Sequence, residues 1–172
     1  MLEGAKVIDL VDRNGKIVYV NESDTVLDAC SKMKHTETGS VLVRNGKGAV
    51  TGIITARDLV RKIVALDKEP AMARVGEVMT GHPTAVRPNI LLPEAMKLMG
   101  AMGICHLPVV DEINGKKEVI GMLSEDDIFA GGCGIPKPEP AGVEENLHAL
   151  HEEVVEEGQD VITEEEILDC LK

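Results

Sequence analysis

The sequence predicts an α/β fold built from two similar halves, and three observations predict it. The segment 52–59, GIITARDL, returns at 121–128 as GMLSEDDI, with glycine, two apolar residues, a hydroxyl and a carboxylate in the same places. Short β-branched runs and stretches of helical spacing follow one another in the same order in both halves. Length differences between the halves fall in glycine- and lysine-rich stretches, where loops absorb insertions cheaply. Such a duplication indicates two units related by approximate twofold symmetry.

The repeat extends well beyond this segment. Residues 7–11 align with 75–79, and the alignment continues through pairs such as Val20 with Val86. We expect a first repeat at 7–68, a second repeat at 75–131, and a linker with an acidic helical tail at 132–172. Neither repeat can bury both faces of its own sheet, so we expect the two to pack together as one α/β unit.

Each repeat is predicted to run strand, helix, strand, strand, helix. In the first repeat we expect a strand at 17–20, a helix at 24–34, and strands at 41–43 and 49–54 joined by a turn. A second helix begins at Thr55. Its apolar residues are expected to form one stripe toward the core, and they are Leu59, Val60, Ile63, Val64 and Leu66. The second repeat follows the same order, with Pro93 in the first turn of a helix and Pro108 near the start of a strand.

Charge and composition exclude several classes of protein. The net charge is −12, but eleven of the 30 acidic residues and one of the 18 basic residues lie at 141–172. The preceding 140 residues therefore hold 19 acidic and 17 basic residues, so this part is near neutral. Without a basic surface, nucleic acid is not an expected partner. No signal segment, Cys-x-x-Cys pair or membrane-spanning apolar run is present, so we expect a cytoplasmic protein with no membrane partner.

The repeated segment carries chemistry that suits a nucleotide. Thr55 and Ser124 follow a strand and open a helix, where free backbone N–H groups favour an anion such as phosphate. Asp58 and Asp127 lie three residues later, and a carboxylate there can accept hydrogen bonds from the two hydroxyls of a ribose. The same spacing is also that of a capping box, in which both side chains only satisfy the helix end. The two roles can coexist.

Taken together, these features resemble a pair of cystathionine-β-synthase (CBS) domains, known as a Bateman module. The resemblance rests on the duplicated order of elements, on Gly-x-x-Thr/Ser-x-x-Asp at the end of each repeat, and on ICHLPVVD at 104–111. It implies a non-catalytic regulatory module, active for example in energy sensing, that binds AMP, ADP, ATP or possibly S-adenosylmethionine in two clefts between the repeats. It also implies a homodimer formed through helical faces.

The resemblance further implies which residues line the clefts. Each cleft combines the hydroxyl-x-x-Asp segment of one repeat with the first strand and the Ile-x-His-x-Pro segment of the other. Cleft A would take Thr55, Arg57, Asp58, Met79, Thr84, Ile104, Cys105 and His106. Cleft B would take Val11, Val18, Thr38, Gly39, Ser40, Ser124 and Asp127.

The two predicted clefts differ in charge. Arg57 and Arg61 accompany the first motif and can meet phosphate oxygens, whereas Glu125 and Asp126 accompany the second. We therefore expect a charged nucleotide in cleft A, and cleft B to be the weaker site.

No catalytic arrangement and no cofactor motif is found, and we expect no metal site. His148, His151 and Glu152 fit a solvated helix face better than a metal site. The expected function is a sensor that binds an adenosine nucleotide and regulates another protein. The alternative is an adaptor with empty clefts that recruits a partner through its acidic tail.

Overall fold

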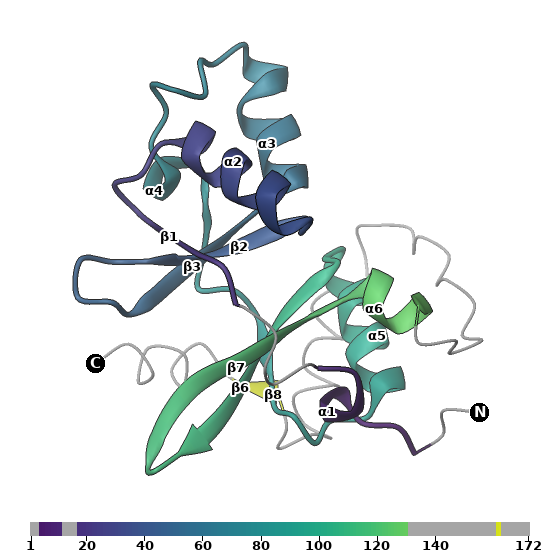
Figure 1. Ribbon diagram of the computed structural model, residues 1–172. Helices are drawn as coiled ribbons and strands as arrows, with labels where there is room; N and C mark the ends of the chain where they lie inside the picture. The colour runs from purple at the N-terminus through teal and green to yellow at the C-terminus, as the bar shows by residue number, and fades with distance from the viewer. Residues whose placement is uncertain (1–3, 12–16, 131–160, 163–172) are drawn as a thin grey trace. The chain divides into compact units, whose positions relative to one another are not determined.

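The computed structural model describes residues 4–11, 17–130 and 161–162, which form two compact units (Figure 1). We name them by the repeat that supplies most of their residues. The repeat-1 unit holds residues 17–83, and the repeat-2 unit holds 4–11, 84–130 and 161–162. The helices expected in the acidic tail, and the histidines at 148 and 151, lie outside the described residues.

The repeat-1 unit has three α-helices on one side of a four-stranded sheet of order β1-β2-β3-β4 (Figure 1). Strand β1 is parallel to β2, and the other neighbours are antiparallel. Its elements are β1 (Tyr19–Asn21), α2 (Val26–Thr36), β2 (Ser40–Arg44), β3 (Val50–Thr55), α3 (Ala56–Lys62), the 3₁₀ turn η1 (Val64–Leu66), α4 (Val75–Val78) and β4 (Thr80–Gly81).

The repeat-2 unit has the same three core strands in the order β7-β6-β5, but its fourth strand, β8, joins the edge at β5, whereas β4 of the repeat-1 unit joins the edge at β3. Its elements are α1 (Val7–Leu10), β5 (Ala85–Val86), α5 (Leu92–Met102), β6 (His106–Ile113), β7 (Lys116–Ser124), α6 (Glu125–Ala130) and β8 (Val161–Ile162). Strand β8 pairs antiparallel with β5, and nothing in the sequence had indicated a strand there. The predicted order of strand, helix, strand, strand, helix is confirmed in both repeats.

Local sequence explains where the two longest helices begin and end. Thr25 caps α2 by accepting a hydrogen bond from the Asp28 N–H, and α2 ends at Glu37 in the left-handed conformation. Pro93 lies in the first turn of α5, where no N–H is needed, and α5 ends at Gly103 with a positive φ of 62°. The position of Pro93 agrees with the sequence-based expectation.

Each unit buries its own apolar core between helices and sheet. In the repeat-1 unit, Val26, Ala29 and Met33 of α2 pack against alternate residues of the strands, such as Val41 and Ile54. The core of the repeat-2 unit is larger. It joins α5 to β6 and β7 through residues that include Leu98, Leu107 and Leu123, all with no measurable exposure.

The two short helices at the heads of the repeats each belong to the unit of the other repeat. The Val7 N–H of α1 donates to the carbonyl of Ile90, and Val7 lies in the core of the repeat-2 unit. In the same way, the Val75 N–H of α4 donates to the carbonyl of Asp24, and Val75 lies in the core of the repeat-1 unit. Residues 7–11 and 75–79, aligned by sequence, are thus equivalent in structure.

The predicted apolar stripe on the helix after Thr55 is wrong in part. Helix α3 ends at Lys62, and only Leu59 and Ile63 reach the core. The chain after Ile63 forms the 3₁₀ turn η1, so the spacing of α3 is not continued and the stripe stops there. The side chains of Val60, Val64 and Leu66 are instead 58%, 71% and 59% exposed.

No helix in the described part of the chain is long and apolar enough to span a bilayer.

Candidate functional site

The first motif forms a closed set of hydrogen bonds at the start of α3. The Thr55 N–H and hydroxyl both donate to Oδ2 of Asp58, at 3.0 and 2.7 Å. In return, the Asp58 N–H donates to the Thr55 hydroxyl at 3.3 Å. This is the geometry of a capping box, so the structural role that the spacing allowed is present.

The other oxygen of Asp58 has two partners that sequence reasoning missed. The Lys62 ammonium lies 2.7 Å from Oδ1 of Asp58, and it also donates to the carbonyl of Val78 at 2.7 Å. The Thr80 hydroxyl donates to the same Oδ1 at 3.3 Å. The spacing of four residues between Asp58 and Lys62 was a usable signal for the ion pair. The local sequence could not predict that Val78 and Thr80 lie beside α3, because their position depends on the packing of α4.

These contacts determine the protonation state of Asp58. Partial burial raises the pKa of its carboxyl, but the hydrogen bonds from Lys62 and Thr55 outweigh this, and the pKa lies below the usual 3.8. Asp58 is therefore an anion at neutral pH. An anion of this kind can accept, but cannot donate, hydrogen bonds.

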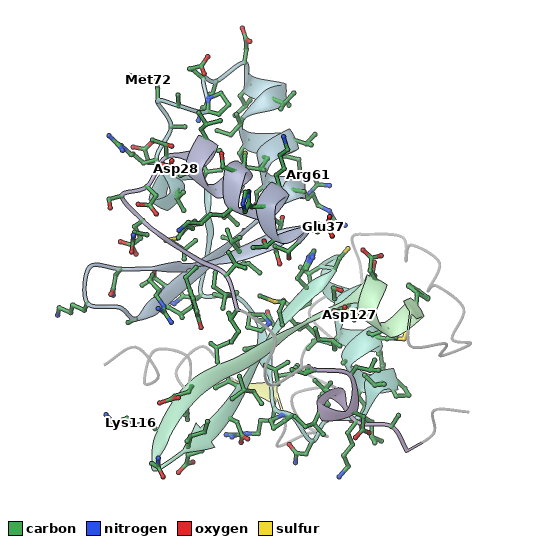
Figure 2. All side chains as sticks on the ribbon, in the orientation of Figure 1. Asp28, Glu37, Arg61, Met72, Lys116 and Asp127 are labelled. Atoms are coloured by element: carbon green, nitrogen blue, oxygen red, sulfur yellow. The ribbon has the colours of Figure 1, made fainter. Side chains whose placement is uncertain are left out.

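The second motif repeats the capping geometry but leaves its aspartate more open. The Ser124 N–H and hydroxyl donate to Oδ2 of Asp127 at 2.9 and 2.5 Å. The Asp127 N–H donates to the Ser124 hydroxyl at 3.1 Å. Asp127 is exposed at the start of α6 (Figure 2), and within the described residues no donor reaches its Oδ1.

Each motif lies beside the loop that leads into the neighbouring strand of its own repeat. Ser40 is opposite Thr55 in the pairing of β2 with β3, and the Ala56 N–H donates to the carbonyl of Gly39. His106 is likewise opposite Ser124, and the Glu125 N–H donates to the carbonyl of Cys105. The predicted combination of each motif with the loop of the other repeat concerns both units together, and it stays a prediction.

Ser40 is unusual among the predicted site residues. Its side chain is only 4% exposed, and its hydroxyl has no hydrogen-bond partner among the described residues. The neighbouring Thr38 hydroxyl donates to the Ser40 carbonyl at 3.1 Å, so it does not satisfy the Ser40 side chain. A buried hydroxyl without a partner is costly and is available to a ligand.

Two glycines allow the heads of the repeats to approach the motif strands closely. A β-carbon on Gly52 would lie 2.5 Å from the Met79 sulfur and 2.9 Å from the Thr80 carbonyl oxygen. In the repeat-2 unit a β-carbon on Gly121 would overlap Val11. Met79 and Val11 therefore occupy equivalent places. Each packs against the glycine of the strand that leads to a motif.

Three further predicted residues, Val18, Ile104 and Thr84, have contacts within their own unit. The Val18 carbonyl accepts from the Leu42 N–H, and the Ile104 N–H donates to the Met99 carbonyl. The Thr84 hydroxyl lies 3.4 Å from the Met102 sulfur.

Charge separates the two motifs as the sequence predicted. Helix α3 carries Arg57 and Arg61, both exposed, and Lys62 adds a third cation to it (Figure 2 labels Arg61). Helix α6 carries Glu125 and Asp126 in its first turn. A phosphate near the first motif is therefore favoured, and one near the second is opposed. No cluster of three metal-ligating side chains occurs in the portion of the chain that the structure describes.

Comparison with known proteins agrees with this architecture. The CBS domain family matches residues 7–65 and 75–131. An uncharacterized protein of Methanopyrus kandleri is 33% identical over 141 residues, which are 80% of this chain and 67% of that protein. The chain spans only 16% and 20% of the length of two further relatives, from Schizosaccharomyces pombe and Arabidopsis thaliana.

Solved structures show the same fold. A putative signal-transduction protein with CBS domains from Burkholderia ambifaria is 32% identical, with a TM-score of 0.66 over 75% of this chain and 94% of that one. A CBS domain protein from Pyrobaculum aerophilum complexed with AMP is 18% identical, with a TM-score of 0.63 over 88% of this chain and 98% of that one. CBS domains are regulatory modules without catalytic activity, and this chain belongs to the CBS domain family, of which it carries a tandem pair.

Proposed function

We propose that this tandem CBS pair is a sensor of adenosine nucleotides and that the Thr55–Asp58 motif is its principal binding site. The proposal depends on one observation, which is that the short helix α3 holds both an ionised carboxylate and exposed cations. Asp58 can accept hydrogen bonds from a ribose, and Arg57 and Arg61 can meet phosphate oxygens. The AMP in the Pyrobaculum aerophilum neighbour supports the choice of ligand class. AMP, ADP and ATP are the candidates, together with S-adenosylmethionine for the less cationic second motif.

Occupancy of the site regulates a partner only if the nucleotide binds one arrangement of the protein more tightly than another. The association of two copies through helical faces stays a prediction. It is supported by exposed apolar side chains on α3 and η1, among which Val64 is 71% exposed.

The test is calorimetric titration of the full chain with AMP, ADP and ATP. The Asp58→Asn substitution keeps a capping oxygen but removes the charge that receives the ribose, so we expect AMP affinity to fall about tenfold. Asp28→Asn is a matched control, because Thr25 and Asp28 form the same capping box on α2. It should leave AMP affinity unchanged.

Two results would contradict the proposal. One is the absence of binding for every adenosine nucleotide tested. The other is an equal loss of affinity in Asp58→Asn and Asp28→Asn, which would show that helix capping, and not ligand contact, explains the loss.

A further inference from the structure

The Asp58 carboxylate has no vacant acceptor position in this structure. A carboxylate offers about four lone-pair positions, two on each oxygen. The Thr55 N–H and hydroxyl fill those of Oδ2, and Lys62 and Thr80 fill those of Oδ1. A ribose hydroxyl can therefore bind Asp58 only after a protein donor leaves. The two donors on Oδ1 are the ones that can be exchanged without breaking the cap.

Lys62 is the donor on Oδ1 that matters more. Its ammonium is 2.7 Å from Oδ1, whereas the Thr80 hydroxyl is 3.3 Å away, which is a long and weak hydrogen bond. The Asp58 side chain is 13% exposed, so its pairing with Lys62 is partly shielded from water. A ligand that takes the place of Lys62 leaves a lysine charge without its partner.

The pairing does not follow from sequence spacing alone. Thr25, Asp28 and Lys32 repeat the spacing of Thr55, Asp58 and Lys62 on a different helix. There, the Lys32 ammonium donates to the Tyr19 carbonyl at 2.8 Å and makes no ion pair with Asp28. Lys62 differs because the carbonyl that anchors it, Val78 at the end of α4, lies where the ammonium can also reach Asp58.

The second motif lacks this lysine. The residue aligned with Lys62 in the second repeat is Gly131, which has no side chain to donate. Oδ1 of Asp127 accordingly has no donor within the described residues. Among the described residues, Oδ1 of Asp127 in the second motif is open to a ribose, whereas Oδ1 of Asp58 in the first is already occupied.

We propose that Lys62 is a specificity-determining residue that makes the first motif select phosphorylated adenosine compounds over uncharged adenosine. Both ligands carry the ribose hydroxyls, and both must displace Lys62 from Oδ1 of Asp58. Only a ligand with a phosphate gives the displaced ammonium a new anionic partner. The inference rests on the proposed function, since it assumes that the ribose binds Asp58.

The experiment compares AMP with adenosine by calorimetry in the full chain. Every protein carries Asp127→Asn, so that the second motif does not contribute. In Lys62→Gln the amide can still donate to the Val78 carbonyl, but the charge is removed. We expect adenosine affinity to rise relative to AMP, so that the ratio of AMP to adenosine affinity falls about fivefold. Lys62→Arg should retain the ratio, and Lys32→Gln, the matched lysine on α2, should leave it unchanged.

The outcomes separate this inference from the proposed function. Weaker AMP binding in Asp58→Asn, together with a lower ratio of AMP to adenosine affinity in Lys62→Gln but not in Lys62→Arg or Lys32→Gln, supports both, and a ratio that rises in Lys62→Gln overturns the role of Lys62. If AMP binds through Asp58 but the ratio is the same in Lys62→Gln as in the parent, the role of Lys62 is overturned and the sensor function stands. If AMP binds the natural chain but not the Asp127→Asn protein, the ligand uses the second motif and the inference fails. If Lys62→Gln does not fold, Lys62→Met replaces it and the same ratio decides.

Discussion

Within the described residues, a hydroxyl and an aspartate three residues apart form the same hydrogen bonds at three places. The pairs are Thr25 with Asp28, Thr55 with Asp58, and Ser124 with Asp127. In each pair, Oδ2 of the aspartate accepts the hydrogen bonds of the helix cap. The second oxygen distinguishes them. Oδ1 of Asp58 accepts from Lys62 and Thr80, whereas Oδ1 of Asp127 has no donor among the described residues. Capping is thus common to all three aspartates, and any ligand role depends on what surrounds Oδ1.

The pKa of Asp58 leads to a pH dependence of stability. Because its pKa in the folded protein is below the usual 3.8, the ionised carboxylate stabilises the fold above that value. The contribution is lost as the pH falls through the folded-state pKa. We expect Asp58→Asn to lower the urea midpoint of unfolding at pH 7, and this difference from the natural chain to shrink below pH 3.8.

Urea unfolding at pH 7, 5 and 3 measures this difference. Asp126→Asn, at an exposed carboxylate on α6, the helix of the second motif, is the comparison and should leave the midpoint close to that of the natural chain throughout. A deficit of Asp58→Asn that is as large at pH 3 as at pH 7 would mean that its charge does not contribute to folding.

At the scale of elements, strand β3 depends on a residue without a side chain. An added β-carbon at Gly52 would meet both the Met79 side chain and the backbone oxygen of Thr80, and the backbone cannot move away cheaply. We expect Gly52→Ala to lower the free energy of unfolding by about 1–3 kcal/mol. Gly46→Ala, in the turn between β2 and β3 with no atom within 4 Å, should change it far less. Chemical denaturation measures both, and equal effects would contradict the close approach.

Local sequence predicted most elements because their signals are local. The cap at Thr25, the proline in the first turn of α5 and the short apolar runs of β2 and β3 on either side of a glycine-rich turn are all visible within a few residues. The helix after Thr55 was predicted too long because Val60 and Val64 look like core residues by type. Only the position of the sheet shows that Leu59 and Ile63 take the core positions. Strand β8 escaped prediction because two residues carry no periodicity.

At the scale of the molecule, the duplication identifies a candidate site, but the contacts of that site depend on tertiary structure. The repeated motif identified Thr55, Asp58, Ser124 and Asp127 without any structure. The pairing of Lys62 with Asp58 could be guessed from spacing, yet the identical spacing at Asp28 and Lys32 gives no ion pair. What differs is the carbonyl that anchors each lysine, and that carbonyl comes from a segment distant in sequence.

Helix α1 belongs to the first repeat in sequence but packs in the repeat-2 unit, so a substitution in α1 should destabilise the repeat-2 unit. Val7 begins the first repeat but is fully buried in the core of the repeat-2 unit. We expect Val7→Ala to cost about 2 kcal/mol. The loss should appear as faster amide hydrogen exchange in α5 and β6 and not in α2.

The mirror substitution supplies the control. Val75 is fully buried in the repeat-1 unit, so Val75→Ala should increase exchange in α2 and β2. Equal loss of protection in both units for either variant would show that they unfold only together.

The crossed assignment of α1 and α4 has a consequence for dissecting the protein. Severing the polypeptide between residues 68 and 69 would leave each fragment carrying a helix that completes the other fragment's core. Neither piece would then be self-sufficient. Mixing the two fragments should restore folded protein by complementation. A variant in which segments 4–11 and 72–79 are exchanged should be more stable than a variant that lacks either segment.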